Sequence, residues 1–384
     1  MSYRGWLIAS VTAAVLLVIA IVLATRQSPI DGGEPEPALK VSPVAPQPAR
    51  KDVADSLSGE MLRSALEELC ADRAVQAGDD AEDSGDTNTR LEPFDQWQQQ
   101  LLSRLSVSPT PEHLVLAALL DEESATRIDL VGRAVSLNPH DAFTLWNAVH
   151  ICSDEHEATG CPLRDWERRL LQGDGQNSET WIRVAANRHQ ARDLVGALEA
   201  LQRAATSAET RAYWTETIEM AERGLAVAGD RSFPERATMA FGIAASTLPD
   251  YGDYWNMCKA QSATDVEWAY ACLRYGETLE NQGKTDIGTA IGLGIQMLAL
   301  EALGDEDAHA GVERRKATRS RQWAQWGADK VSVAEQLVTS TPARFSSYLA
   351  AVRRHGEAGA RALIVDEIDR LLQREPELVC ASEP

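Results

Sequence analysis

Apolar residues recur at helical spacing along almost the whole chain after residue 52. Leu101, Leu102 and Leu105, for example, repeat at the intervals that place side chains on one face of an α-helix. The sequence shows no strict alternation of apolar and polar residues of the kind that predicts β-strands. Pro, Gly, Asn and Asp separate short amphipathic segments, and short loops make consecutive helices antiparallel neighbours. We therefore predict an all-α fold of antiparallel helical hairpins.

One apolar run differs because it has no charged side chain. Residues 6–25 read WLIASVTAAVLLVIAIVLAT, and at a rise of about 1.5 Å per residue a helix of this length approaches the ~30 Å hydrocarbon core of a bilayer. The run exceeds the core of a cleaved signal peptide, which is about 7–15 residues long. We predict a transmembrane signal-anchor helix with residues 1–5 in the cytoplasm. The alternative is a signal peptide cleaved after Val22-Leu23-Ala24.

The rest of the chain divides by composition. Residues 26–52 are rich in proline, which favours an extended linker over a helix. The predicted segments that follow are an N-terminal helical segment (53–107), a group of helical repeats (108–230), C-terminal helical hairpins (231–376) and a tail (377–384).

Cysteine spacing predicts disulfide bonds if the body lies outside the cytoplasm. Cys152 and Cys161 flank a polar turn, and Cys258 and Cys272 bracket another short connection. We expect each of these two pairs to be bonded. Cys70 and Cys380 remain at the two ends of the body, and their pairing is left open.

A metal site is the alternative for the first cysteine pair. His150, Cys152, His156 and Cys161 are all possible zinc ligands within a short stretch. They contain no Cys-x-x-Cys pair, however, and their spacing matches no common zinc site. We therefore favour the disulfide bond and predict no metal.

The clearest repeated unit begins at Ser178 and reads SETWIRVAANRHQARDLVGALEALQRAATSAE. It resembles the tetratricopeptide repeat family, whose unit is a helical hairpin of about 34 residues. The matching positions are one large aromatic residue, three small residues and one large aliphatic residue: Trp181, Ala185, Ala197, Ala204 and Leu201. Arg188 and Glu209 depart from the family pattern.

A partial earlier copy contains Val131, Ala134, Pro139 and Trp146. The resemblance covers roughly residues 108–210. It implies a stack of hairpins, an α-solenoid, with a concave groove that binds a peptide or protein.

In that family the first helix of each hairpin lines the groove. The resemblance implies that the groove positions here are Glu179, Ile182, Ala186, His189 and Gln190. Ala186 stands where a carboxylate-binding repeat has an Asn, so recognition of a peptide's C-terminal carboxylate is not expected.

The charge of the chain excludes one class of partner. Its 384 residues include 58 Asp and Glu but 37 Lys and Arg, for a formal charge of −21. Nucleic-acid binding requires clustered basic residues, so we expect no nucleic-acid partner.

Motifs for catalysis are lacking in the sequence. Gly288, Gly292 and Gly294 lie in an apolar run without the Lys-Ser/Thr of a phosphate-binding loop, and we assign them to close helix packing. Five tryptophans in the second half of the chain could form a sugar-binding platform: Trp214, Trp255, Trp268, Trp323 and Trp326. Their places in the helical pattern favour core positions instead. Trp323 and Trp326, three residues apart, also fit an exposed patch. We expect no enzymatic activity and no cofactor.

Together these patterns predict a single-pass protein of a bacterial inner membrane whose body lies in the periplasm. Its expected function is that of a scaffold that binds protein or peptide partners in the cell envelope. Two alternatives stay open: an envelope enzyme acting on peptidoglycan or another polymer, and a self-associating structural protein.

Overall fold

The computed structural model describes residues 92–154, 160–229, 231–326 and 328–375. Every regular element in these ranges is a helix, and the one β-type pairing is an isolated bridge between Asn177 and Glu209. The all-α prediction is therefore confirmed for this part of the chain. The described residues belong to one compact unit within Asp52–Pro384. Predictions for residues 6–25, the proline-rich linker, Cys70, His156, Cys380 and the tail lie outside the described residues.

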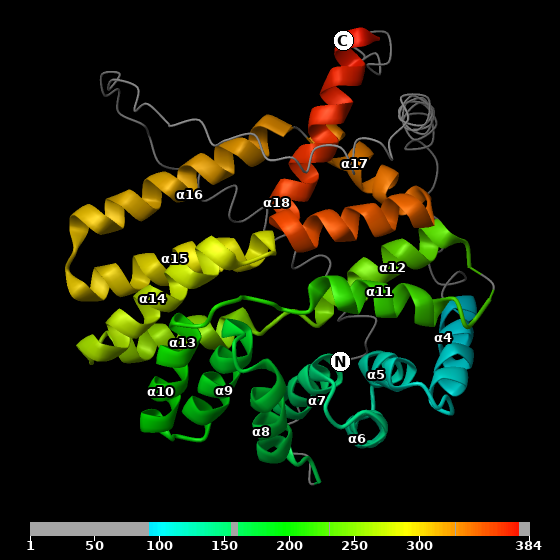
Figure 1. The fold of residues 1–384 in the computed structure, drawn as a ribbon, viewed down its shortest axis with the longest axis horizontal. Coiled ribbons are helices and arrows are strands. Elements are labelled where there is room, and N and C mark those ends of the chain that lie inside the picture. The colour runs from blue at the N-terminus through cyan, green and yellow to red at the C-terminus, as the bar shows by residue number, and fades with distance from the viewer. Residues whose placement is uncertain (1–91, 155–159, 230, 327, 376–384) are drawn as a thin grey trace. The chain divides into compact units, whose positions relative to one another are not determined.

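The helices follow one another with short connections (Figure 1). In chain order they are α4 (Glu92–Leu105), α5 (Pro111–Leu120), α6 (Ser124–Leu137), α7 (Ala142–Asp154), α8 (Leu163–Asp174), α9 (Ser178–Gln190), α10 (Leu194–Ala205), α11 (Trp214–Leu225), α12 (Phe233–Ser246), α13 (Tyr251–Ser262), α14 (Val266–Gln282), α15 (Asp286–Leu303), α16 (Glu306–Trp326), α17 (Ala328–Ser340) and α18 (Pro342–Arg374).

Neighbouring helices pack as pairs. Consecutive helices in extensive contact include α5 with α6, α7 with α8, α9 with α10, α11 with α12, α14 with α15, and α17 with α18. The predicted boundary at residue 230 lies in sequence between α11 and α12, which pack against each other.

Helices α9 and α10 coincide with the two helices expected from the clearest repeat. Asn177 and Asp193 cap their N-termini by accepting hydrogen bonds from the backbone of Glu179 and Gly196. The small and large apolar positions singled out in the sequence are fully buried: Ala185, Ala197, Leu201 and Ala204. Small side chains let the two helices approach closely, so this pair is tightly packed.

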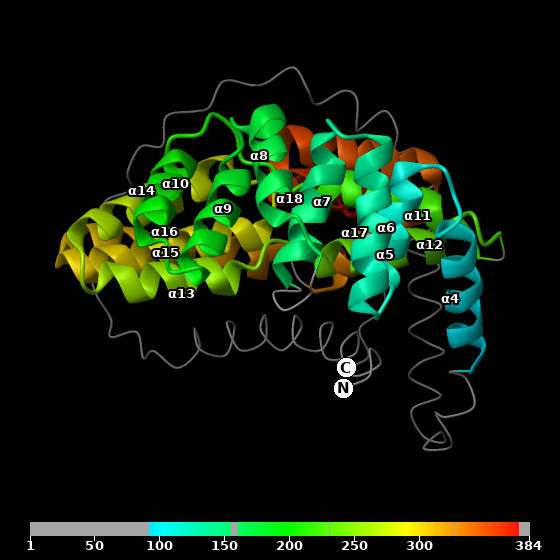
Figure 2. The ribbon, with the colours of Figure 1, turned by 90° about the horizontal axis from the view of Figure 1, so that it is seen from below.

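The second half of the chain folds back on the first. Helix α11 contacts α5, α13 contacts α9, and α14 contacts α10. Figures 1 and 2 show α5 to α10 as one row, with α11 to α15 lying along it. In a simple solenoid each hairpin contacts only its neighbours in sequence. The faces of α5 and α9 are instead covered by later helices of the same chain.

Apolar side chains gather in two main clusters. One joins α4–α8 with α11, α12, α17 and α18, and the other joins α9 and α10 with α13–α15. Trp146 lies at the centre of the first cluster and Tyr254 in the second, both almost fully buried. A polar region lies where the two clusters meet, and it contains the cavity described below.

Glycines allow α14 and α15 to pack closely, as predicted. A Cβ atom on Gly292 would lie 2.7 Å from the Gly276 carbonyl oxygen, and one on Gly294 would lie 2.5 Å from the Trp255 ring. Gly288 is also enclosed, by Thr285 and Tyr251. Among the described residues α15 is the one helix that is long and apolar enough to cross a membrane, but 44% of that window is buried in the protein. A core helix of a soluble protein gives the same result.

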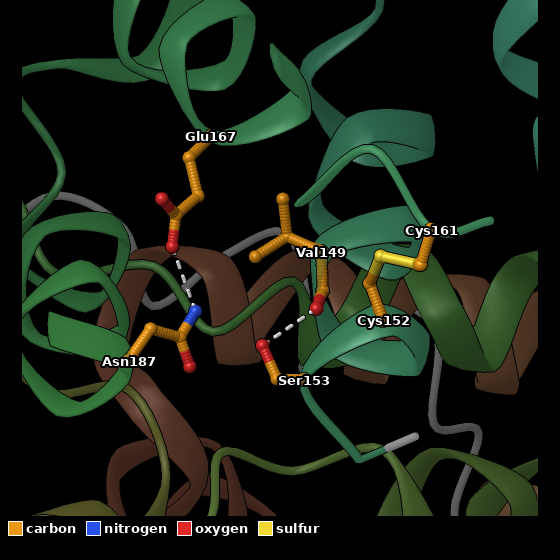
Figure 3. The surroundings of a disulfide bond; sticks show 6 residues. All are labelled: Val149, Cys152, Ser153, Cys161, Glu167 and Asn187. Carbon is orange, nitrogen blue, oxygen red and sulfur yellow. Dashed lines mark hydrogen bonds between the residues drawn. A yellow bond between two sulfur atoms is a disulfide. The ribbon is translucent and has the colours of Figure 1, made fainter. Parts of the chain in front are cut away.

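The structure brings both predicted cysteine pairs to disulfide distance. The Cα atoms are 5.9 Å apart in the Cys152–Cys161 pair and 5.8 Å apart in the Cys258–Cys272 pair, within the usual range for disulfides. Cys152 lies in the last turn of α7 and Cys161 precedes α8, so this pair links the two helices (Figure 3). On the far side of α8, Asn187 of α9 donates a hydrogen bond to Glu167, 2.8 Å away (Figure 3).

The zinc alternative gains no support from the residues that the structure describes. They contain no group of three His, Cys, Asp or Glu residues arranged to hold a metal ion. His150 is buried in α7, and burial, followed by the charge of Arg183, holds its pKa well below the usual value.

The tryptophans divide between core and surface. Trp268 is buried, and Trp214 and Trp255 are partly buried against the apolar clusters. Trp323 is 40% exposed, which fits the alternative of an exposed position and not a place in the core. Its ring lies 4.3 Å from the Arg361 guanidinium, which accounts for an aromatic residue at this exposed position. The side chain of Trp326 lies outside the described part of the chain.

Candidate functional site: a cavity closed by a buried glutamate

A cavity of about 520 Å³ lies at the junction of the two apolar clusters. Its walls come from the start of α9, the segment between α10 and α11, the start of α13, the turn between α14 and α15, and α18. Its volume falls in the range of ligand-binding pockets. Glu179 and Tyr251 lie at the buried end, whereas Asn281, Lys284 and Arg353 are exposed at the rim.

The segment between α10 and α11 forms one wall because α9 fixes its backbone. The amide of Ser178 donates to the Glu209 carbonyl at 2.8 Å, and the amide of Glu209 donates to the Gln176 carbonyl at 3.2 Å. The side chain of Asn177 forms hydrogen bonds with both the backbone carbonyl and the backbone amide of Arg211. These contacts carry the chain back past α9 to Tyr213, whose ring lies 5.4 Å from that of Trp146 in α7.

A second layer of hydrogen bonds surrounds Asp174 at the end of α8. Its carboxylate accepts from Thr180 at 2.6 Å, from Asn177 at 2.8 Å and from the Arg211 guanidinium at 2.7 Å. The guanidinium of Arg211 also lies 4.7 Å from the ring of Tyr213. Arg211 is therefore held between a carboxylate and an aromatic ring, and its charge is already compensated.

Glu179 is the unusual group of the cavity. Its side chain is 1% exposed, and neither carboxylate oxygen makes a hydrogen bond of standard geometry with a described residue. Burial raises its pKa to about 7, while the charge of Arg183 and the nearby Tyr251 hydroxyl lower it in part. A buried carboxylate normally has hydrogen-bond partners or a counter-ion. Arg183 and Tyr251 compensate Glu179 only in part, because neither forms an ion pair or a standard hydrogen bond with it, and this marks Glu179 as a candidate functional group.

Tyrosines surround this carboxylate from two other helices. Tyr251 opens α13 and lies near both Glu179 and Thr285. Burial raises the pKa of Tyr251, Tyr254 and Tyr275, and the negative charge of Glu179 adds to the effect. All three hydroxyls therefore stay protonated across the physiological range.

Helix α18 is fixed beside the cavity by a polar cluster. The Arg361 guanidinium lies 2.6 Å from the Asp286 carboxylate, and the Asp286 amide donates to Glu357 at 2.7 Å. Burial, followed by the charge of Asp286, raises the pKa of Glu357 to about 7. The amide of Glu357 donates to the Lys284 carbonyl, and the preceding Gly356 has a φ of 73°, which interrupts α18 at this contact. The turn from Lys284 to Asp286 is thereby held against α18.

The five groove positions implied by the repeat resemblance do not share one open surface. Glu179, Ile182 and Ala186 are buried. His189 is partly buried, with its ring 6.2 Å from Trp268 and its Nε2 3.1 Å from the Gln261 amide. Gln190 is exposed and donates to Asp253. Helix α13 covers this face of α9, because the chain folds back there, and Glu179 is the one position of the five that lines the cavity.

Sequence reasoning missed most of the other cavity residues. Tyr213, Thr210 and Tyr251 carry no motif, and the distance in sequence between them hides their proximity. One feature of the sequence does point to this region. The polar segment GDGQNSE contains Asp174 and the capping residue Asn177 directly before the start of α9 at Ser178.

The arrangement can bind a polar group within an aromatic enclosure. Besides Glu179, several lining side chains have buried polar atoms without a standard hydrogen bond in the described residues: Thr210 Oγ1, Tyr213 Oη, Trp214 Nε1, Tyr251 Oη and Gln282 Oε1. Water or a ligand normally satisfies such groups. No protein-family model matches the chain, and no curated protein matches it significantly.

Proposed function

We propose that this chain is a membrane-anchored helical-repeat protein of the bacterial periplasm that binds a protein or peptide partner. The partner engages the mouth of the cavity and places a polar group inside it. The observation that carries this proposal is the buried Glu179 carboxylate, which lines an open cavity and forms no ion pair within 4.0 Å among the described residues.

Features of the whole chain support the rest of the proposal. The three consecutive pairs α5/α6, α7/α8 and α9/α10 form a row of helical hairpins, which is compatible with the repeat resemblance proposed for residues 108–210. The apolar residues 6–25 suit a membrane anchor. Two cysteine pairs at disulfide distance fit an oxidising compartment such as the periplasm.

The fold changes where the partner is expected to bind. Because α11 and α13 cover α5 and α9, the concave face implied by the repeat resemblance is occupied by the chain itself at these helices. The cavity mouth, with exposed Asn281 and Lys284, is the accessible surface next to the Glu179 carboxylate.

An envelope enzyme is the second candidate, and one observation favours it. A carboxyl with a pKa of about 7 suits general acid–base catalysis. Hydrolysis of a glycosidic polymer, however, uses two carboxyl groups that flank the bond. The other carboxylates of the cavity are engaged: Glu209 lies 4.0 Å from Arg211, and Glu216 accepts from Thr215. The geometry therefore supports binding better than catalysis.

Site-specific photo-crosslinking in the full-length, membrane-inserted chain tests the proposal. A photoreactive amino acid replaces Asn281 at the cavity rim, and a matched control carries it at Glu199, an exposed position on α10. We expect one defined polypeptide adduct from position 281 and none from position 199. The substitution Ala212→Trp, which fills the cavity from its wall, should abolish that adduct.

Two outcomes would overturn the proposal. One is an equal adduct pattern from both positions. The other is an adduct from position 281 that persists unchanged when Ala212→Trp occupies the cavity in a folded protein, as checked by circular dichroism.

A further inference from the structure

The charged side chains around the cavity leave the Glu179 carboxylate without an ion pair. Arg183, one helical turn after Glu179, places its guanidinium 4.1 Å from the centre of the Trp146 ring. It makes no ion pair within 4.0 Å with Glu179 among the contacts of the described residues. The Arg183 guanidinium therefore packs on Trp146 of the first apolar cluster and acts on Glu179 by its charge without forming an ion pair.

The other cations of the lining are also engaged elsewhere. Arg211 pairs with Asp174 at 2.7 Å, and Arg353 pairs with Glu219 at 2.6 Å. The Lys284 ammonium lies 3.5 Å from the Arg354 carbonyl oxygen at the rim. Within the described residues, therefore, no cation forms an ion pair with Glu179, although the charge of Arg183 acts on it from one helical turn away.

Aromatic side chains form part of the cavity walls. Tyr213, Trp214 and Tyr251 all line the cavity. Aromatic faces attract cations through their quadrupole, and the attraction is strongest when the cation is desolvated. A carboxylate at the end of an aromatic enclosure is complementary to an ammonium group. An anionic ligand would be repelled by Glu179, and a neutral ligand would leave its charge uncompensated.

We infer that the cavity binds an alkylammonium group, whose nitrogen pairs with Glu179 and whose alkyl chain lies against Tyr213, Trp214 and Tyr251. This inference rests on the proposed function and names the chemistry of the bound group. A lysine side chain of a polypeptide and a free alkylamine share that chemistry. The cavity volume of about 520 Å³ accommodates either.

Isothermal titration calorimetry of the full-length chain in detergent micelles at pH 8.5 tests the inference. At this pH Glu179, whose pKa is about 7, is ionised. The groups that face it from the packed elements are Arg183 of α9, Tyr251 and Tyr254 of α13, and Tyr275 of α14. Their raised pKa values keep the tyrosines neutral at this pH.

Three ligands test whether binding depends on the positive charge or only on the alkyl chain, and whether a lysine side chain or a free amine binds better. They are n-pentylamine, the neutral analogue 1-pentanol, and N-acetyl-lysine amide. We expect n-pentylamine to bind and 1-pentanol not to bind. If N-acetyl-lysine amide binds at least about tenfold more tightly than n-pentylamine, the group comes from a polypeptide; equal binding assigns it to a free amine.

Charge-neutralising variants complete the test. Glu179→Gln should weaken binding of n-pentylamine about 10- to 100-fold, the loss expected for a hydrogen bond to a charged group. Glu199→Gln removes the same charge from an exposed position on α10 and should leave binding unchanged. Glu179→Asp keeps the charge and should retain part of the affinity, which guards against a folding defect in the Gln variant.

The inference is overturned if 1-pentanol binds as tightly as n-pentylamine, or if Glu179→Gln binds the amine as well as the unmodified chain does. If either calorimetry result occurs while the crosslink still forms only from residue 281, the ammonium chemistry is rejected and the proposed function stands. If residues 281 and 199 give the same crosslinks, the proposed function itself is rejected.

Discussion

The side chain of Asn177 holds the backbone of Arg211 through two hydrogen bonds. Its Nδ2 donates to the Arg211 carbonyl at 2.8 Å, and its Oδ1 accepts from the Arg211 amide at 2.9 Å. The same Oδ1 accepts from the Glu179 amide at 3.1 Å, which caps α9. One buried side chain therefore positions both the cavity wall and the helix that carries the Glu179 carboxylate.

Substitution Asn177→Ala should destabilise the protein by about 3–5 kcal/mol, because it removes a helix cap and leaves buried backbone groups of Arg211 without partners. Chemical denaturation measures the loss. Hydrogen exchange should also accelerate at the amides of Glu179 and Arg211. Asn281→Ala, at an exposed site, is the control and should change stability by less than about 0.5 kcal/mol. Equal stability of the two variants would contradict this role.

The raised pKa of Glu179 predicts a pH-dependent stability difference. Because the folded state holds this proton up to about pH 7 and the unfolded state releases it near pH 4.5, the group destabilises the fold increasingly as the pH rises between those values. The stability of Glu179→Gln relative to the unmodified protein should therefore increase by about 2–3 kcal/mol from pH 5 to pH 8. Denaturant unfolding at both pH values measures it.

The contributions of other titrating groups to the pH dependence of stability cancel when the two proteins are compared. Glu357 acts in the same direction as Glu179, because its pKa is also raised to about 7. His150 acts oppositely: its lowered pKa means that stability is lost as the pH falls below the unfolded value near 6.5. Both are present in the two proteins, so the difference reports Glu179. A pH-independent difference would show that Glu179 is ionised normally.

Close packing of α14 and α15 predicts opposite effects for two Gly→Ala substitutions. At Gly292 the new methyl would meet the backbone of Gly276 and Glu280 at 2.7 and 2.8 Å. Gly292→Ala should cost about 1–3 kcal/mol despite the better helix propensity of Ala. Gly242 of α12 has no atom within 4 Å of the added Cβ, so Gly242→Ala should stabilise by up to about 1 kcal/mol. Thermal unfolding of both variants tests the pair.

The more exposed of the two cysteine pairs should be reduced first. Cys258 and Cys272 are fully buried, whereas Cys161 of the other pair is partly exposed. Under native conditions, low concentrations of dithiothreitol should therefore open Cys152–Cys161 first, as followed by alkylation and mass spectrometry. Loss of the Cys258–Cys272 bond should cost about 3 kcal/mol by the loop-entropy relation. Alkylation of all four thiols before reduction would contradict disulfide formation.

The helical pattern was predictable because it is local. Pro139 follows the end of α6, as its position in the repeat suggested, and α9 and α10 match the two halves of the clearest repeat. The short spacings of the cysteine pairs likewise identified partners that share one loop. Glu179 was named as a binding residue by resemblance, although for a groove that α13 covers.

The amino-acid sequence by itself determined where the helices begin and end, which faces are apolar and which nearby cysteines meet, since each depends on residues a few positions apart. Only the tertiary structure decided that α11 returns to α5 and that Asn177 meets Arg211. Those contacts join residues distant in sequence, and they depend on how two apolar clusters pack against each other. Burial of Glu179 between the clusters, and with it the altered acidity of its carboxyl, is a product of that packing.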